Sequence, residues 1–338
     1  MDFTATAQNT GMPPVCMEYR FIGARYERLI AQFRSGRYAH AYLFSGELGI
    51  GKLTFARYLA SLVLCESNTP PCGICSQCKQ TREGKHSSVT EIAPQDIKAI
   101  PVDRIRELIS DVSMYSLDGR QRIVIIEPME SLTPQAQNCL LKSLEEPSVS
   151  ITYFLLSHDA SSLLDTILSR CFVFKLTPWP EEVLVRHLQN LGYSKEKAQY
   201  AAVLSGGNVG EALTVLDEQA GGANEAALRQ LLQVSSARDA VVCSAALKDA
   251  GANALSILFL LERYLQQCLL VKTGLLNAKL LDSPWIASIQ NASRQDLTNL
   301  IEQVFYARKL KMSNVNWQST IDQLIFKLLE AKRSWQKS

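Results

Sequence analysis

The sequence predicts an α/β fold in which a mostly parallel sheet fills the first half and helices alone fill the second. Short β-branched runs alternate with helical patterns up to about residue 176, as expected when crossover helices join parallel strands. The strand candidates are continuous apolar runs, which is typical of a sheet covered on both faces. Beyond Leu176, Pro178 and Pro180 interrupt the chain, and only helical patterns follow.

The individual elements follow from these patterns. The predicted strands are Ala41–Phe44, Ile123–Ile126, Thr152–Leu156 and Cys171–Lys175. The predicted helices of the first half are Leu53–Leu64, Val102–Ser113, Pro134–Glu146 and Ser161–Leu168. Long amphipathic helices follow from about residue 225, among them Leu255–Val271 and Ile321–Lys332.

These elements predict three domains. A sheet domain spans residues 1–176 and carries a cysteine-rich insert at about 65–78. A small helical domain follows at 177–220, and a larger all-α domain occupies 225–338. The pair Gly221-Gly222 predicts a hinge between the last two.

Composition and charge exclude several classes of protein. A chain of 338 residues with 47% hydrophobic content is too apolar to be disordered, and a net charge of +2 does not by itself indicate a phosphate-binding surface. The longest apolar stretch, from Ile257 to Val271, contains Glu262 and Arg263 and therefore predicts no membrane span. The first ten residues lack the basic start and apolar run of a secretory signal, so we expect a cytoplasmic protein.

A glycine-rich loop lies between the first predicted strand and helix. The segment from Gly46 to Thr54 reads GELGIGKLT, and Gly46, Gly49, Gly51 and Lys52 stand in P-loop order. In such a loop, backbone N–H groups converge on phosphate oxygens at a helix N-terminus, and the lysine adds positive charge. The residue after the lysine is Leu53 where a Mg²⁺-binding hydroxyl is expected, and Thr54 comes one position late. Two alternatives remain: a compromised ATP site, or a relic loop that glycine packing keeps in shape.

The second ATPase element is also degenerate. An ATPase of this kind needs an apolar strand ending in two acids, one for the metal and one for the attacking water. Here the strand Ile123–Ile126 is followed by Glu127 and Pro128, and proline has neither a charge nor a backbone donor. We therefore expect the isolated chain to hydrolyse ATP little or not at all.

Four clustered cysteines predict a metal site. Cys65, Cys72, Cys75 and Cys78 have the spacing C-x6-C-x2-C-x2-C, which suits one tetrahedral Zn²⁺ closed by four thiolates. A closed site of this kind is structural rather than catalytic. His86 lies near in sequence but is surplus to a four-cysteine site, and we expect it to be a packing or surface residue.

The segment from Arg122 to Leu176 resembles the core of bacterial clamp-loader AAA+ subunits. The most specific matches are NCLLKSLEEP at 138–147 and ILSRC at 167–171, and the opening HAYLFSG at 40–46 and the cysteine insert agree with them. The resemblance is strong over residues 18–217 and weaker beyond. It implies a P-loop AAA+ (RecA-like) sheet domain with a zinc module, a helical lid domain and a C-terminal helical collar.

The departures from the family pattern set this chain apart from the family's motor subunits. The motor subunits have a hydroxyl after the P-loop lysine, an Asp-Glu pair and a sensor arginine, where this chain has Leu53, Glu127-Pro128 and Gly210. Ser157 lies near the first sensor position. Arg170 is retained, and in the family this arginine reaches the γ-phosphate on a neighbouring subunit, where a guanidinium stabilises the transferring phosphoryl group.

The resemblance implies a non-hydrolysing subunit of the replicative clamp loader that donates Arg170 as an arginine finger. Its partners would be the tau or gamma motor subunits and delta, and the assembled complex would place the beta clamp on primed DNA. Two alternatives stay open. The chain could be an active motor subunit, with Thr54 and Glu127 in place of the displaced ligands. Its zinc module could instead bind single-stranded nucleic acid, although the absence of clustered arginines and aromatic residues around Cys65–Cys78 argues against this.

Overall fold

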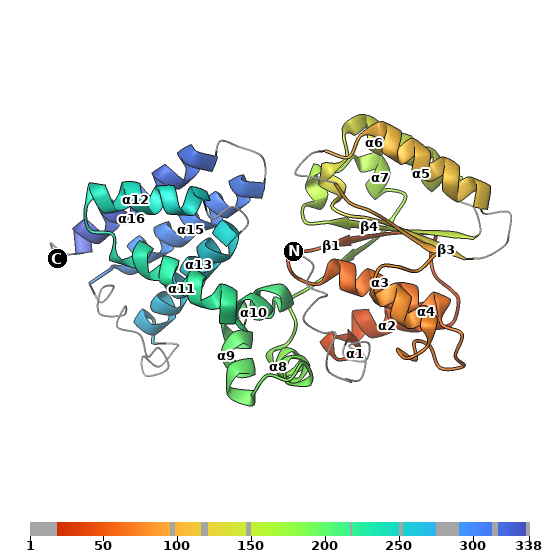
Figure 1. Ribbon diagram of the computed structural model, residues 1–338, viewed down its shortest axis with the longest axis horizontal. Coiled ribbons are helices and arrows are strands. Elements are labelled where there is room, and N and C mark those ends of the chain that lie inside the picture. The colour runs from red at the N-terminus through yellow and green to blue at the C-terminus, as the bar shows by residue number, and fades with distance from the viewer. Residues whose placement is uncertain are drawn as a thin grey trace. The chain divides into compact units, whose positions relative to one another are not determined.

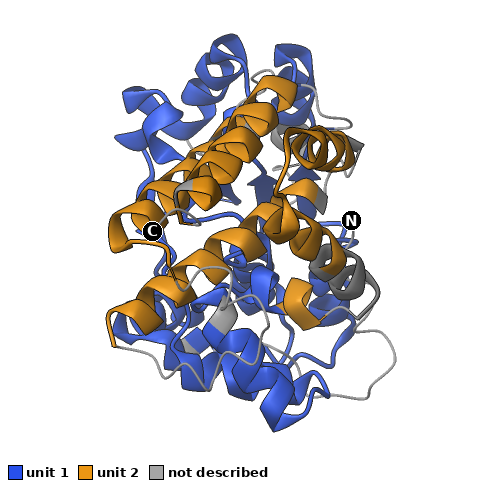
Figure 2. Ribbon diagram, turned by 90° about the vertical axis from the view of Figure 1, so that its left-hand side faces the viewer, with its two compact units in different colours: residues 1–212 blue, residues 213–338 orange. Residues whose placement is uncertain are grey.

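A computed structural model describes residues 19–94, 99–115, 121–146, 150–216, 218–249, 253–274, 291–312 and 317–335. The chain forms two compact units, residues 1–212 and 213–338 (Figure 2). Pro147 of the NCLLKSLEEP segment and the first 18 residues of the predicted sheet domain lie outside the described residues.

The first unit is built on a parallel sheet of five strands in the order β2-β3-β4-β1-β5. Four strands confirm the prediction within two residues at each end, and the edge strand β2 is additional. In the central pair, Ser45 at the end of β1 lies opposite Ser157 at the end of β4. The strands are β1 (Ala41–Ser45), β2 (Val89–Ile92), β3 (Arg122–Ile126), β4 (Ile151–Ser157) and β5 (Phe172–Lys175).

Helices cover both faces of this sheet, as the continuous apolar strands predict (Figure 1). On one face, α5 (Val102–Tyr115), α6 (Pro134–Glu145) and α7 (Asp165–Leu168) share a core with alternate strand residues such as Leu43 and Leu155. On the other face, strand residues such as Phe44 form an aromatic cluster with Phe55 of α3 (Lys52–Leu64) and with neighbouring rings. The short helices α1 (Tyr19–Ile22) and α4 (Ser76–Arg82) and the helix α2 (Ala24–Arg34) lie on this second side.

The predicted helix Ser161–Leu168 is wrong over its first half. Asp159 accepts a hydrogen bond from the backbone N–H of Ser161 at 3.1 Å and closes a 3₁₀ turn at Ala160–Ser162. Leu163 is then extended and buried at 5% exposure, and only Asp165–Leu168 is α-helical. Burial of Leu163 in the core therefore outweighs the local helical pattern.

Three short helices complete the first unit: α8 (Glu181–Asn190), α9 (Lys195–Ser205) and the start of α10 (Val209–Leu216). Residues 177–212, which are most of the predicted lid domain, thus belong to the same compact unit as the sheet. The division of the chain into three domains stays a prediction.

The second unit contains only helices among its described residues. Its core gathers buried leucine, isoleucine and alanine side chains from all five helices, as the amphipathic patterns predict. The predicted hinge at Gly221-Gly222 is wrong, because both glycines lie inside one helix. No helix in the described part of the chain is long and apolar enough to span a membrane. The helices are α11 (Glu218–Gln233), α12 (Ala237–Asp249), α13 (Asn253–Lys272), α15 (Arg294–Met312) and α16 (Trp317–Trp335).

Candidate functional site

The glycine-rich loop connects β1 to α3, in the strand, loop and helix order that the sequence predicts. Gly49 and Gly51 have φ angles of +80° and +93°, which side chains with a Cβ rarely adopt. Gly51 is the N-cap of α3, so Lys52 stands in its first turn. The loop therefore has the glycine backbone angles and the helix N-terminus that are typical of a P-loop.

The P-loop lysine contacts its own loop. Lys52 Nζ donates hydrogen bonds to the carbonyl oxygens of Gly46 at 2.8 Å and Glu47 at 2.9 Å, and the residue is 5% exposed. Burial lowers the pKa of Lys52, while the carboxylates of Glu127, Glu130 and Glu47 act in the opposite direction. A phosphate entering this loop would have to displace two hydrogen bonds to the lysine.

The start of α10 closes the loop from outside. Asn208 donates from Nδ2 to the carbonyl oxygen of Leu48 at 2.8 Å, and the Gly210 N–H donates to the carbonyl oxygen of Gly49 at 2.9 Å. A Cβ at Gly210 would lie 2.9 Å from Gly49 Cα, and a Cβ at Gly49 would lie 2.8 Å from Asn208 Oδ1. No side chain fits at position 210 unless the loop moves, so the closed loop requires a glycine there.

The positions expected to hold a metal and a water molecule are altered as the sequence indicates. Leu53 and Thr54 occupy the first turn of α3, and Thr54 is exposed. Burial raises the pKa of Glu127, although the nearby Lys52 acts in the opposite direction. Pro128 follows Glu127 and begins the turn into the 3₁₀ helix Met129–Ser131. Directly after β3, the chain thus offers one half-buried carboxyl group, that of Glu127, in place of two adjacent acids.

Glu130, which sequence reasoning missed, lies in the 3₁₀ helix Met129–Ser131 and contacts the end of β4. Its Oε1 atom accepts hydrogen bonds from Ser157 Oγ at 2.6 Å and from the backbone N–H groups of His158 and Asp159, each at 2.7 Å. Burial by itself raises the pKa of Glu130, but the His158 side chain, whose Nδ1 lies 3.3 Å from Glu130 Oε2, and these hydrogen bonds outweigh it and hold the pKa at about 2. The predicted sensor residue, Ser157, is fully buried and points its hydroxyl at Glu130. No local pattern could have predicted this contact, because 27 residues separate the partners.

The four predicted cysteines come together. Their sulfur atoms all lie within 4.8 Å of one another, and the pair Cys65 and Cys75 is 4.0 Å apart. A tetrahedral Zn²⁺ with bonds of about 2.3 Å would need sulfur separations of about 3.8 Å, so the cluster can hold a metal ion with small adjustments. Backbone N–H groups of Cys75 and Ile74 lower the pKa of Cys72 to about 6, whereas burial raises the pKa of Cys78. This geometry favours thiolate at the exposed end of the cluster.

The cysteine module is anchored to the sheet by an ion pair. Arg57 of α3 contacts both carboxylate oxygens of Glu91 in β2, at 2.8 and 2.7 Å, and donates to the carbonyl oxygen of Arg82 at the end of α4 at 3.2 Å. His86 is buried and contacts Gln77 at 2.6 Å, outside the cysteine cluster. The prediction that His86 is a packing residue is therefore confirmed.

Arg170 lies near the surface, at the end of the sheet where the strands begin. The glycine loop lies at the end where the strands finish. Its side chain is 32% exposed and forms an ion pair with Glu145 at the end of α6. In β5, Phe172 lies opposite Tyr42 and Lys175 lies opposite Ser45, where the loop begins. The three residue steps from Phe172 to Lys175 span about 10 Å along the strand, and Arg170 comes two residues before Phe172. Arg170 therefore lies farther from its own loop than one side chain extends.

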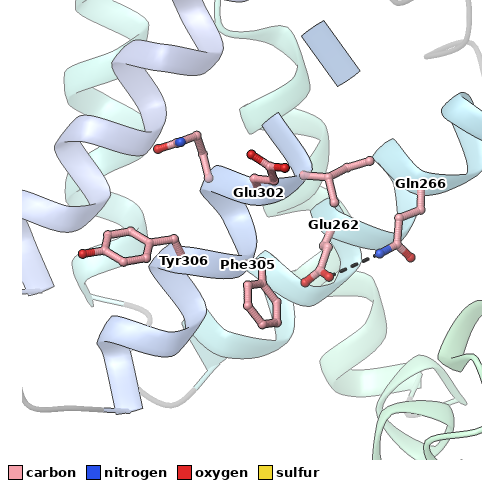
Figure 3. A pocket seen from close by; sticks show the side chains of 7 residues that line it. Glu262, Gln266, Glu302, Phe305 and Tyr306 are labelled. Carbon is pink, nitrogen blue, oxygen red and sulfur yellow. Dashed lines mark hydrogen bonds between the residues drawn. The ribbon is translucent and has the colours of Figure 1, made fainter. Parts of the chain in front are cut away.

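The second unit carries one further hollow, between α13 and α15 (Figure 3). Phe305 and Tyr306 form its exposed apolar rim, and Gln266 donates to Glu262 at 3.3 Å across its floor. Glu262 also forms an ion pair with Arg308 at 2.5 Å. Glu262 is thus paired within the unit, and Glu302 is a second acid in the lining.

The parallel sheet, the P-loop after strand β1 and the helices that follow it define a P-loop protein of the AAA+ class. A family model described as DNA polymerase III, delta subunit, matches residues 23–180. The delta-prime subunit of Pseudomonas aeruginosa is 40% identical over 138 residues, which are 40% of this chain and 42% of that protein. The delta-prime subunit of Bacillus subtilis is 29% identical over 87% of this chain and 92% of that protein.

The tau subunit of Escherichia coli is 32% identical over 54% of this chain but only 29% of its own length. A gamma subunit-related protein of Thermotoga maritima superposes over 90% of this chain and all of that one, with a TM-score of 0.46 and 20% identity. The chain thus spans less than half of the first relatives that it matches, but nearly all of the Bacillus protein. The chain is therefore similar to bacterial DNA polymerase III delta-prime subunits, over residues 23–180 in the family model and over most of its length in the Bacillus protein.

The closed glycine loop leads to a prediction about nucleotide binding. We expect no saturable binding of Mg-ATP to the isolated chain at millimolar concentration, because Lys52 is buried and hydrogen-bonded within the loop, and Asn208 and Gly210 tie the loop's carbonyl oxygens to the start of α10. Titration calorimetry measures this directly, with an ATP-binding motor subunit as positive control. Micromolar affinity that Lys52→Ala abolishes would show instead that the loop opens and binds nucleotide.

The cysteine cluster predicts a stoichiometric metal. The purified chain should contain about one zinc ion per molecule, and Cys75→Ser should lose the metal and lower the melting temperature. Cys139→Ser, which changes a cysteine outside the cluster, is the matched control. Elemental analysis that finds no metal in the wild-type chain, or equal metal in the Cys75 variant, would exclude this site.

The depressed pKa of Glu130 predicts a pH-dependent contribution to stability. The ionised carboxylate stabilises the folded state at neutral pH, and this contribution should fall as the pH drops from the ordinary glutamate range towards about 2. Glu130→Gln should lower the free energy of unfolding at neutral pH by about 2 kcal/mol. The difference between wild type and variant should shrink at pH values near 3.5.

Urea unfolding at several pH values measures the Glu130 effect. Glu146→Gln, an exposed glutamate, is the control and should leave stability unchanged. A Glu130 variant as stable as the wild type at neutral pH would rule out this role.

Proposed function

We propose that this chain is a non-hydrolysing clamp-loader subunit that donates Arg170 as an arginine finger to an ATPase subunit beside it. The observation that carries the proposal is the position of Arg170. It is exposed at the edge of the sheet away from its own glycine loop, so a phosphate that it contacts belongs to another molecule. A guanidinium supplied in this way stabilises negative charge on the transferring phosphoryl group.

The chain's own nucleotide site supports the non-hydrolysing half of the proposal. Leu53 replaces the metal-binding hydroxyl, and Pro128 replaces the acid that would orient water. The loop itself is closed by Asn208 and Gly210. Steady ATP turnover by the isolated chain, abolished by Lys52→Ala, would favour the alternative of an active motor subunit.

The partners follow from the family. Relatives of this chain are named as delta-prime, tau and gamma subunits of DNA polymerase III, and we propose assembly with tau or gamma and with delta in the bacterial cytoplasm. In that assembly, the ATP cycle of the motor subunits would open the beta clamp and place it on primed DNA. The four-cysteine module would hold a structural Zn²⁺ whose thiolate ligands come from this chain alone.

The finger role predicts an effect on the assembled complex. Arg170→Ala should leave folding and assembly intact, because the side chain is exposed, and should lower the clamp- and DNA-stimulated ATPase rate by at least about tenfold. The measurement is steady-state phosphate release by the complex reconstituted with tau or gamma and delta.

The control for this experiment is Arg106→Ala. Arg106 is another exposed arginine that pairs with a carboxylate, that of Asp103 at 2.9 Å, but it lies on α5. Its replacement should leave the ATPase rate unchanged. An Arg170→Ala complex that assembles and hydrolyses ATP at the wild-type rate would remove the finger role.

A further inference from the structure

The surroundings of Arg170 contain a carboxylate to which nothing above gives a role. Glu145 is the last residue of α6, and its Oε1 atom pairs with Nη2 of Arg170. The two residues are 25 positions apart: Glu145 ends α6, and Arg170 lies in the turn after α7. Helix α6 is held in place by the Thr133 N-cap and by buried Leu140 and Leu144, so the carboxylate projects from a fixed support.

Two further contacts hold the other side of the guanidinium. Arg170 Nη1 donates to the carbonyl oxygen of Thr166 at 2.9 Å and to Ser169 Oγ at 3.2 Å. The Ser169 hydroxyl in turn donates to the same Thr166 carbonyl at 3.1 Å. The turn after α7 therefore holds one nitrogen of the side chain, and α6 holds the other.

We propose that Glu145 is a positioning residue that holds Arg170 ready for a neighbour's phosphate, an inference that rests on the proposed finger role. A free arginine side chain has about 2 kcal/mol of rotamer entropy to lose on binding, and contacts from two helices remove part of this cost in advance. The finger would then meet the γ-phosphate from a fixed direction, as a preorganised group must.

The geometry indicates that Glu145 positions Arg170 rather than blocking its access to a phosphate. One carboxylate oxygen of Glu145 contacts one terminal nitrogen of Arg170, rather than both oxygens gripping the guanidinium. Among the described residues, no hydrogen bond to Nε of Arg170 is found, so N–H groups remain for a phosphate. An exposed ion pair contributes little stability, so it orients the side chain without resisting a doubly charged phosphate.

A double-mutant cycle tests the proposal in the reconstituted complex, with ATP as the substrate. Glu145→Gln should lower kcat for ATP about fivefold, the rate equivalent of the ~1 kcal/mol that an exposed ion pair can hold, and should leave KM for ATP unchanged. In a complex that already carries Arg170→Ala, Glu145→Gln should have no further effect, because its partner is absent. A merely structural role would lower the rate in both backgrounds.

The control is Glu146→Gln, which makes the same charge change one residue further along. Glu146 is exposed and forms no ion pair within the described part of the chain, and its replacement should leave kcat unchanged. The melting temperature of each isolated variant should equal that of the wild type, since both glutamates lie on the surface.

The outcomes separate the two proposals. A rate that falls with Arg170→Ala but not with Glu145→Gln would overturn the positioning role and leave the finger role standing. An ATPase rate that rises with Glu145→Gln would show that the ion pair inhibits the reaction and would also overturn the positioning role. A rate that is unchanged by Arg170→Ala would remove the finger itself. A loss of activity by Glu145→Gln in both backgrounds would assign Glu145 to structure.

Discussion

The polarity of the parallel sheet is the constraint on which the rest of this structure depends. Every strand runs in the same direction, so residues that follow strands gather at one edge and residues that precede strands gather at the other. The glycine loop follows β1 at the first edge, and Arg170 precedes β5 at the second. A chain folded in this way can offer a guanidinium to a neighbour but cannot bring it to its own loop.

The first edge of the sheet has been rebuilt with internal contacts. The carbonyl oxygens of Leu48 and Gly49 accept hydrogen bonds from the start of α10, and Lys52 Nζ donates to the carbonyl oxygen of Gly46. Ionised Glu130 similarly satisfies the backbone donors at the end of β4. These contacts engage carbonyl oxygens of the loop and the amino group of Lys52. They also explain the glycines beside the altered catalytic positions, because Gly49 and Gly210 approach too closely for side chains.

Local sequence patterns predicted the elements that pack on both faces. Strands β1, β3, β4 and β5 are apolar enough to be recognised. Strand β2 is an edge strand of four residues like β5, but it contains the polar residues Thr90 and Glu91. The hinge expected at Gly221-Gly222 failed because two glycines lower helix propensity without preventing a helix whose neighbours favour it.

In the candidate site too, features set by local sequence spacing were predictable, and contacts between distant segments were not. The cysteine cluster was predictable because its spacing is local, and His86 was rightly left out of it. The closure of the loop by Asn208 was not predictable, because 160 residues separate the side chain from the carbonyl that it contacts. The ion pair of Glu145 with Arg170 likewise depends on how α6 packs against α7, which no local spacing encodes.

The central claim is that Arg170 acts on a neighbour's nucleotide, and a cryo-EM structure of the assembled complex with a γ-phosphate analogue tests it most directly. The account predicts the guanidinium of Arg170 within hydrogen-bonding distance, about 3 Å, of the analogue bound by the adjacent subunit. A well-resolved map in which Arg170 turns back onto its own subunit, with no nucleotide beside it, would contradict the account.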